Sequence, residues 1–396
     1  MEQEECLEVS SRPSSCLNYA LPFELLGEIF SHISEDPLDL RYAILVCRSW
    51  HNAVVHHPNL WTSIILGSTF LTRFRGARLH HGDAFVRLCI SRSSPLPLRI
   101  SVYNLGRLSL YDIESGAFSD ECFSDECFFD ECFSLVKHIL DRYSGEPDSL
   151  FQRCSSLSWI FVGEVPGIDL VARTFTEASF PALEYMTIQN LSLSDVGPTI
   201  GFPRLPRLRE VTLIDHSESC IPPFFHDNDF ANVERLTFVT TSAWMDFDVN
   251  CIRRFRSIRV LMLKGESFHD NYLETLHDPL KPVELSLLET LSLSGEVPHQ
   301  ILNLIRTPGL RTMEIEADSA KGYHSLAAPN LVHMVWTLER LCVSLSEEMH
   351  ETSWVEELEQ LVARAPSLSS VLVSPWMVRH LAGKEWHIKL HVTDPK

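Results

Sequence analysis

The chain has 396 residues, 45% of them hydrophobic, and its 33 basic and 53 acidic side chains give a formal net charge of −20. No window approaches the roughly 18 consecutive apolar residues that a membrane span needs, and the negative charge disfavours nucleic acid and anionic membranes as partners. The acidic N-terminus lacks the apolar segment of a secretory signal, and the 11 cysteines include no CxxC pair. We therefore expect free thiols in a reducing compartment, cytoplasmic and/or nuclear.

Residues 20–33, ALPFELLGEIFSHI, have the spacing of an amphipathic helix. The apolar stripe recurs at four-residue steps, at Leu21, Leu25, Ile29 and Ile33, and is widened by Leu26 and Phe30. Pro22 occupies a first-turn position, where a proline costs no helical hydrogen bond. An apolar stripe of this kind packs against the protein's own core, a membrane or another protein, and the spacing alone does not distinguish these three.

Residues 34–66 predict a second helix that starts at Asp36-Pro37 and has two apolar faces. One face holds Leu40, Ala43, Ile44, Cys47, Trp50 and Val54, and the other holds Leu38, Tyr42, Leu45 and Val46. A unit of about 45 residues has room for one small core. The second face therefore needs a cover, which is a partner protein or the rest of the chain.

Residues 20 to about 61 resemble an F-box. The matching pieces, in order, are Leu21-Pro22, Glu24-Leu25-Leu26, Ile29-Phe30, Leu45-Val46-Cys47-Arg48-Ser49-Trp50 and Pro58-Asn59-Leu60-Trp61, while His32-Ile33-Ser34 departs from the usual end of the first helix. The resemblance implies a three-helix unit that docks onto a Skp-type adaptor and through it joins a cullin–RING ubiquitin ligase. It also implies adaptor-binding positions at Leu21, Pro22, Leu25, Leu26 and Ile29, with Leu38, Leu45, Val46 and Trp50 forming or supporting the same surface.

A hexamer of the form apolar-x-x-apolar-x-apolar recurs along residues 157–373, mostly at intervals of 21 to 30 residues. The nine hexamers begin at Leu157, Leu183, Leu208, Val233, Ile258, Leu288, Leu310, Leu331 and Leu368. Such a period is typical of a stacked array, in which no repeat can bury its apolar face alone. Alternating apolar positions within each hexamer predict a half-buried strand.

Each repeat is predicted to run helix, turn, strand. HQILNLIRTP places Ile301, Leu302 and Ile305 on one helical face, and the capping box Ser353 to Glu356 opens a helix that ends at Pro366. LPLRISV near residue 100 predicts an opening strand, and WHIKLHV near the end of the chain predicts a closing one. The pattern resembles degenerate leucine-rich repeats, since the usual asparagine after the strand is replaced, by His216, Thr241, Glu266 and Glu296.

The predicted fold class is α/β, with an N-terminal three-helix F-box followed by a leucine-rich-repeat-like, right-handed α/β solenoid that has a parallel strand face. We expect four regions: a disordered acidic N-terminus (1–17), the F-box (18–62), a linker with irregular first repeats (63–150) and the solenoid (151–396). The linker contains the tandem SDECFSDECFFDECF, residues 119–133. Its three cysteines lie at five-residue steps rather than in the close pairs of a zinc site, so no metal is expected.

The sequence contains no phosphate loop, no GxGxxG, no HExxH and no GxSxG motif. No catalytic residue and no cofactor is therefore predicted. The leading hypothesis is a non-catalytic substrate receptor of a Skp–cullin–F-box type ubiquitin ligase. The alternatives are a solenoid scaffold whose N-terminal helices only cap its own array, and an enzyme with dispersed catalytic residues.

The unknown target protein is predicted to bind the outer face of the strands, formed by the third and fifth residues of each hexamer. Most of these residues are small and polar. The exceptions cluster and are the predicted target-binding residues: Tyr185, Arg235, Val260 and Met262. Aromatic, arginine and methionine side chains often dominate the energy of protein interfaces.

Overall fold

A computed structural model describes the chain from residue 21 onward, with gaps. The described residues are 21–33, 37, 39–67, 79–103, 138–139, 142–143, 150–160, 180–189, 205–214, 230–240, 252–253, 255–265, 282–295, 304–317, 334–345, 353–381, 386 and 388–392. The SDECF tandem and predicted site residue Leu38 lie outside this part of the chain. The chain divides into two compact units, residues 1–65 with 74–100, and residues 66–73 with 101–396.

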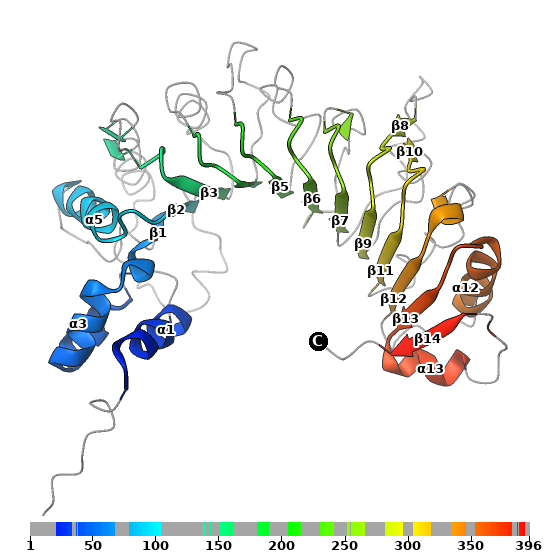
Figure 1. Cartoon of the computed structure of the whole chain (residues 1–396), viewed down its shortest axis with the longest axis horizontal. Helices are drawn as coiled ribbons and strands as arrows, with labels where there is room; N and C mark the ends of the chain where they lie inside the picture. The colour runs from blue at the N-terminus through cyan, green and yellow to red at the C-terminus, as the bar shows by residue number, and fades with distance from the viewer. Residues whose placement is uncertain are drawn as a thin grey trace, which may run out of the picture. The chain divides into compact units, whose positions relative to one another are not determined.

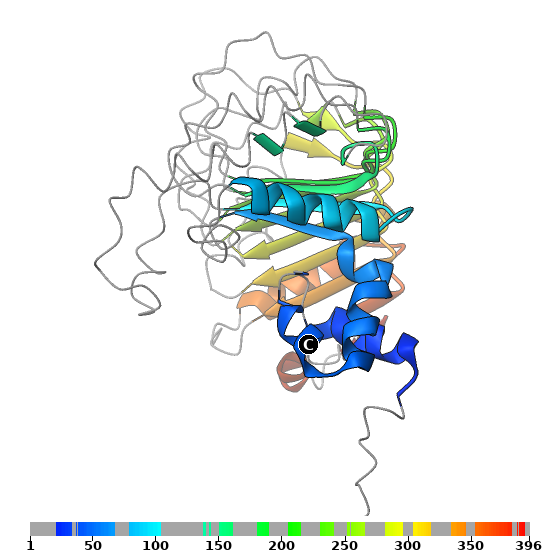
Figure 2. The ribbon, with the colours of Figure 1, turned by 90° about the vertical axis from the view of Figure 1, so that its left-hand side faces the viewer.

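The first unit is mostly helical. Its elements are α1 (Phe23–Ile33), α2 (Arg41–Val46), α3 (Arg48–His56), the 3-10 helix η2 (Pro58–Trp61) and α5 (Leu79–Arg92), together with the first residues of the strands β1 (Ser63–Gly67) and β2 (Leu98–Tyr103). Helix α1 packs on α3 and on η2, and α2 packs on α3. Figure 2 shows these helices in blue, apart from the cyan α5.

The predicted second helix is two helices. Cys47 has extended backbone dihedrals (φ −161°, ψ 169°) that separate α2 from α3. The helix also begins later than predicted, because Pro37 starts a turn in which the Leu40 amide donates to the Pro37 carbonyl (3.2 Å) and α2 follows at Arg41. The three-helix arrangement of α1, α2 and α3 is the result.

The second unit contains a long parallel sheet, to which the last residues of β1 and β2 also belong. The further strands are β3 (Cys154–Ile160), β4 (Tyr185–Gln189), β5 (Glu210–Ile214), β6 (Arg235–Thr240), β7 (Val260–Gly265), β9 (Thr290–Gly295), β11 (Thr312–Ala317), β12 (Arg340–Leu345), β13 (Ser370–Val373) and β14 (Lys389–Val392). The 12 strands follow one another in chain order, and each pair from β3 to β14 is parallel (Figure 1). The α/β fold class with a parallel strand face is confirmed.

The register shows why the hexamers recur. In the second repeat the apolar positions one, four and six are Leu183, Met186 and Ile188, and all three side chains are buried. The same positions align from strand to strand, so that Met186 faces Val211 and Ile188 faces Leu213. Stacking these rows builds a continuous apolar core that no single repeat could form.

Two predicted hexamers are out of phase. The first begins at Cys154 rather than Leu157, since Ser156 pairs with Tyr185 and places Cys154 level with Leu183. The eighth begins at Leu338 rather than Leu331. In both cases the true hexamer matches the apolar pattern as well as the predicted one, and pairing with the neighbouring strand decides between them.

The segments that precede the strands are more varied than helix and turn. Ile305–Arg306 forms a short strand, β10, which pairs in parallel with β8 (Val283–Glu284), and the helix predicted there is wrong at these residues. A 3-10 turn, η6 (Val335–Thr337), precedes β12, whereas the predicted helix is present as α12 (Ser353–Arg364), before β13. Helix α13 (Pro375–Leu381) precedes the closing strand β14. Among the described residues no helix is both long enough and apolar enough to cross a membrane.

Candidate functional site

The first unit has a small, well-packed core. Leu26 and Phe30 of α1 are buried, and the Phe30 ring meets the Trp50 ring of α3 edge-on, with 5.1 Å between centroids. Trp61 of η2 is also buried, and its indole nitrogen donates to the Val54 carbonyl (2.8 Å). These contacts fix α1, α3 and η2 against one another.

The same unit exposes much of its apolar surface. The described part of the chain has 13 exposed large hydrophobic side chains, and eight of them lie between residues 21 and 46. These eight, called the α1–α2 apolar face below, are Leu21, Phe23, Leu25, Ile29, Ile33, Tyr42, Leu45 and Val46. Exposed apolar side chains in this number on a small unit are typical of an interaction site.

Most of the predicted adaptor-binding residues lie on this surface. Leu21, Pro22, Leu25, Ile29, Leu45 and Val46 are exposed, with Leu45 reaching 80%. Leu26 is 1% exposed and Trp50 is half-buried, so these two side chains support the face from inside. The difference follows from helix geometry, because adjacent residues on a helix point about 100° apart.

Three further members of the face were not among the predicted positions. Phe23 and Ile33 extend it along α1, and Tyr42 extends it on α2. The sequence does indicate two of them. Ile33 continues the four-residue steps of Leu21, Leu25 and Ile29, and Tyr42 lies three residues before Leu45, on the same side of a helix. Arg41 covers one side of the Tyr42 ring, with its guanidinium carbon 4.7 Å from the ring centroid, and donates to the Tyr42 hydroxyl (2.7 Å).

The second unit brings three of the predicted target-binding residues into one row. Tyr185, Arg235 and Val260 occupy the same register position on β4, β6 and β7, with Glu210 of β5 between the first two. Tyr185 is 48% exposed. The Arg235 guanidinium lies 3.7 Å from the Glu210 carboxylate, and both side chains remain accessible to solvent.

Met262 lies in the next outward row, two residues further along β7. This row also contains Thr187, Thr212 and Thr237 on β4, β5 and β6. Its members are half-buried, except Thr237, which is buried. The four predicted residues therefore form a group within β4–β7 of the strand face.

Because the eighth hexamer begins at Leu338, a different residue of β12 belongs to the row that contains Tyr185, Arg235 and Val260. The row's member on β12 is Arg340, which pairs with Thr312 and Ser370. The pattern had placed His333 there, as the third residue of the hexamer predicted at Leu331, and His333 lies outside the described residues. In the next row Cys342 lies beside Glu314. Burial raises the pKa of the Cys342 thiol, and the negative charge of Glu314 adds to this rise.

Comparison with known families and proteins identifies one part of the chain. Residues 19–66 match the model of the F-box-like family. No curated protein matches the chain. F-box domains bind Skp-type adaptors, and the matched residues include the whole α1–α2 apolar face. The similarity of residues 19–66 to the F-box-like family supports a role for this part of the chain in binding the adaptor of a Skp–cullin–F-box type ubiquitin ligase.

Proposed function

We propose that this protein is a substrate receptor of a Skp–cullin–F-box type ubiquitin ligase. The first unit binds the Skp-type adaptor, which links the chain to a cullin–RING ligase, and the strand face of the second unit binds the target protein. The receptor itself is non-catalytic. Its contribution is to raise the effective concentration of the target near the ubiquitin carrier that the other subunits supply.

The observation that carries the proposal is the exposure of the α1–α2 apolar face. Leu25 is 45% exposed and Leu45 is 80% exposed, although the same unit buries Leu26 and Phe30 almost completely. The helices thus do not cover this face themselves. Removing a leucine side chain from water contributes about 1.5–3 kcal/mol, so a few such residues buried together supply most of the energy of a specific interface.

Support for a target site on the strand face comes from the side chains that meet there. Tyr185 and Val260 lie three strands apart, which corresponds to about 14 Å at 4.8 Å per strand. This span fits a short segment of a partner protein. Tyrosine, arginine and methionine are residue types that contribute strongly when an interface buries them together.

Adaptor binding is tested with charge substitutions at exposed positions of the face. Leu25→Asp combined with Leu45→Asp places two carboxylates in a contact that must exclude water, and we expect at least a hundredfold loss of affinity. The matched control is Leu287→Asp, since Leu287 is 49% exposed but belongs to the second unit. Full-length variants are compared in pull-down with a purified Skp-type adaptor, and retained binding by the double variant contradicts the proposal.

Target binding is tested separately. The four predicted residues are changed together to alanine, and proteins captured under conditions that trap ubiquitin-ligase clients are quantified. We expect loss of client recovery with unchanged adaptor binding. Undiminished recovery would place target recognition outside these residues.

A further inference from the structure

The second position of the hexamer alternates in charge along the sheet. The seven residues at this position from β4 to β12, called the charge ladder below, are Glu184, Arg209, Glu234, Arg259, Glu289, Arg311 and Glu339. The sign of the charge changes at each step, and the ladder ends at uncharged residues, Ser155 on β3 and Ser369 at the entry of β13. The third position of the same repeats has only three charged residues, so the alternation is specific to the second position.

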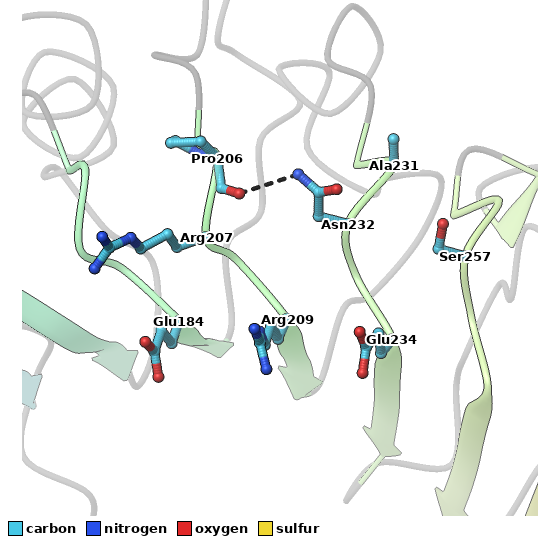
Figure 3. Close-up of a pocket in the computed structure, with 8 residues that line it drawn as sticks. All are labelled: Glu184, Pro206, Arg207, Arg209, Ala231, Asn232, Glu234 and Ser257. Atoms are coloured by element: carbon cyan, nitrogen blue, oxygen red, sulfur yellow. Dashed lines mark hydrogen bonds between the residues drawn. The ribbon is translucent and has the colours of Figure 1, made fainter.

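Backbone hydrogen bonds place each member of the ladder beside the next. From Arg209 to Glu339, the amide of each member donates to the carbonyl of the preceding member at 2.8–2.9 Å. Neighbouring members are therefore one strand apart, about 4.8 Å, whereas members of equal sign are two strands apart, about 10 Å. Figure 3 shows the first three members, Glu184, Arg209 and Glu234, in a line at the entries of β4, β5 and β6.

The charges of the ladder are accessible to solvent. Glu184 and Glu289 are half-buried, and the other five members are exposed. The Arg259 guanidinium contacts the Glu289 carboxylate at 2.7 Å. An exposed ion pair contributes little by itself, because water screens it and both side chains lose freedom. Each inner member of the ladder, however, lies between two charges of opposite sign, so that small attractions add along the sheet.

The apolar core does not identify which repeats are neighbours. Position four is apolar and buried in all seven repeats, at Met186, Val211, Leu236, Leu261, Leu291, Met313 and Leu341. A strand paired with the next strand but one, with the repeat between them left out of the sheet, would still match these apolar rows. The ladder distinguishes the two arrangements, because leaving out one repeat places two carboxylates or two guanidinium groups side by side.

We propose that the charge ladder specifies which repeats become neighbours. It attracts each strand entry to the adjacent ones and repels it from the next but one. The inference goes beyond the proposed receptor function and does not depend on it, since neither an adaptor nor a target takes part. The strand order that the ladder favours is the order that brings Tyr185, Arg235 and Val260 into one row.

The test is a charge swap within the contacting pair, Arg259→Glu with Glu289→Arg, in the full-length protein. The swap keeps the net charge and the opposite signs of the pair, but it places a carboxylate beside Glu234 and a guanidinium beside Arg311. We expect on the order of fivefold faster hydrogen–deuterium exchange of β7 and β9 peptides at low salt. The acceleration should be much smaller in about 1 M sodium chloride, because salt screens the repulsion.

The matched control is the same swap in a background in which Glu234→Gln and Arg311→Gln remove the flanking charges. There the swapped pair has uncharged neighbours, so the swap should change the hydrogen exchange of β7 and β9 by less than about twofold. Equal acceleration in the two backgrounds would overturn the inference, because the cost would then arise within the pair. Absence of acceleration in both would overturn it as well, since like charges side by side would then carry no penalty.

Discussion

Adjacent leucines on α1 have opposite roles, and exchanging each for alanine separates folding from binding. Leu26 is 1% exposed, so Leu26→Ala removes a fully buried side chain and leaves a cavity, at a cost of about 3–4 kcal/mol. Leu25 is 45% exposed, and because leucine and alanine are both good helix formers, Leu25→Ala should change stability by less than about 0.5 kcal/mol.

Hydrogen–deuterium exchange of α1 peptides in the full-length protein measures the first effect. A loss of 3 kcal/mol accelerates exchange through opening of the unit by about 150-fold, whereas Leu25→Ala should leave the rate within about twofold. Calorimetric titration with the Skp-type adaptor measures the second effect. Leu25→Ala should weaken binding by about five- to thirtyfold, through the loss of 1–2 kcal/mol of apolar contact.

Similar behaviour of the two variants in both assays would contradict the separate roles of Leu25 and Leu26. Equal exchange rates would mean that Leu26 is not part of the core. Unchanged adaptor affinity in Leu25→Ala would mean that the exposed stripe of α1 is not the contact surface.

Three further predictions concern single positions. Gly295→Ala should lower the melting temperature by several degrees in calorimetry, because Gly295 has φ +79° and a Cβ there would overlap the carbonyl oxygen of Gly265. An unchanged melting temperature would show that this position does not require glycine. Gly27→Ala should destabilise the first unit, since the added methyl would overlap the His57 ring; unchanged exchange of α1 peptides would contradict this. Cys342 should react with a thiol reagent at higher pH in the folded protein than in urea, because burial raises the pKa of its thiol. The contribution of this thiol to stability is therefore complete below its unfolded pKa and declines as pH rises above that value. Equal pH profiles of the reaction in the folded and unfolded states would contradict the prediction.

Hydrophobic pattern alone predicted the stacked strands, because positions one, four and six of a hexamer must be apolar for neighbouring repeats to share a core. It could not choose between overlapping matches. LVHMVW and LERLCV both fit the pattern, and the second forms the strand because the Glu339 amide donates to the Arg311 carbonyl (2.8 Å) of the preceding repeat. Such pairing involves residues 28 apart, which a local pattern does not contain.

The helical unit shows a similar division. Spacing identified the apolar stripe of α1, but a stripe that is apolar over two faces does not reveal which leucine is inside. Leu26 is buried in a unit where α1 packs on α3 and on η2, whereas Leu25, one residue earlier, is 45% exposed. The break at Cys47 was also hidden, since an extended residue between two helices leaves no mark in their apolar spacing.

The central claim is that the α1–α2 apolar face binds the adaptor, and side-chain footprinting tests it most directly. The full-length protein is labelled with a carbene or hydroxyl-radical reagent, alone and with a purified Skp-type adaptor, and the modified positions are identified by mass spectrometry. We predict strong protection of Leu25, Ile29, Tyr42 and Leu45 by the adaptor, with Tyr185 on the strand face labelled as before. If the adaptor leaves the labelling of these four residues unchanged, the α1–α2 apolar face is not the adaptor-binding surface.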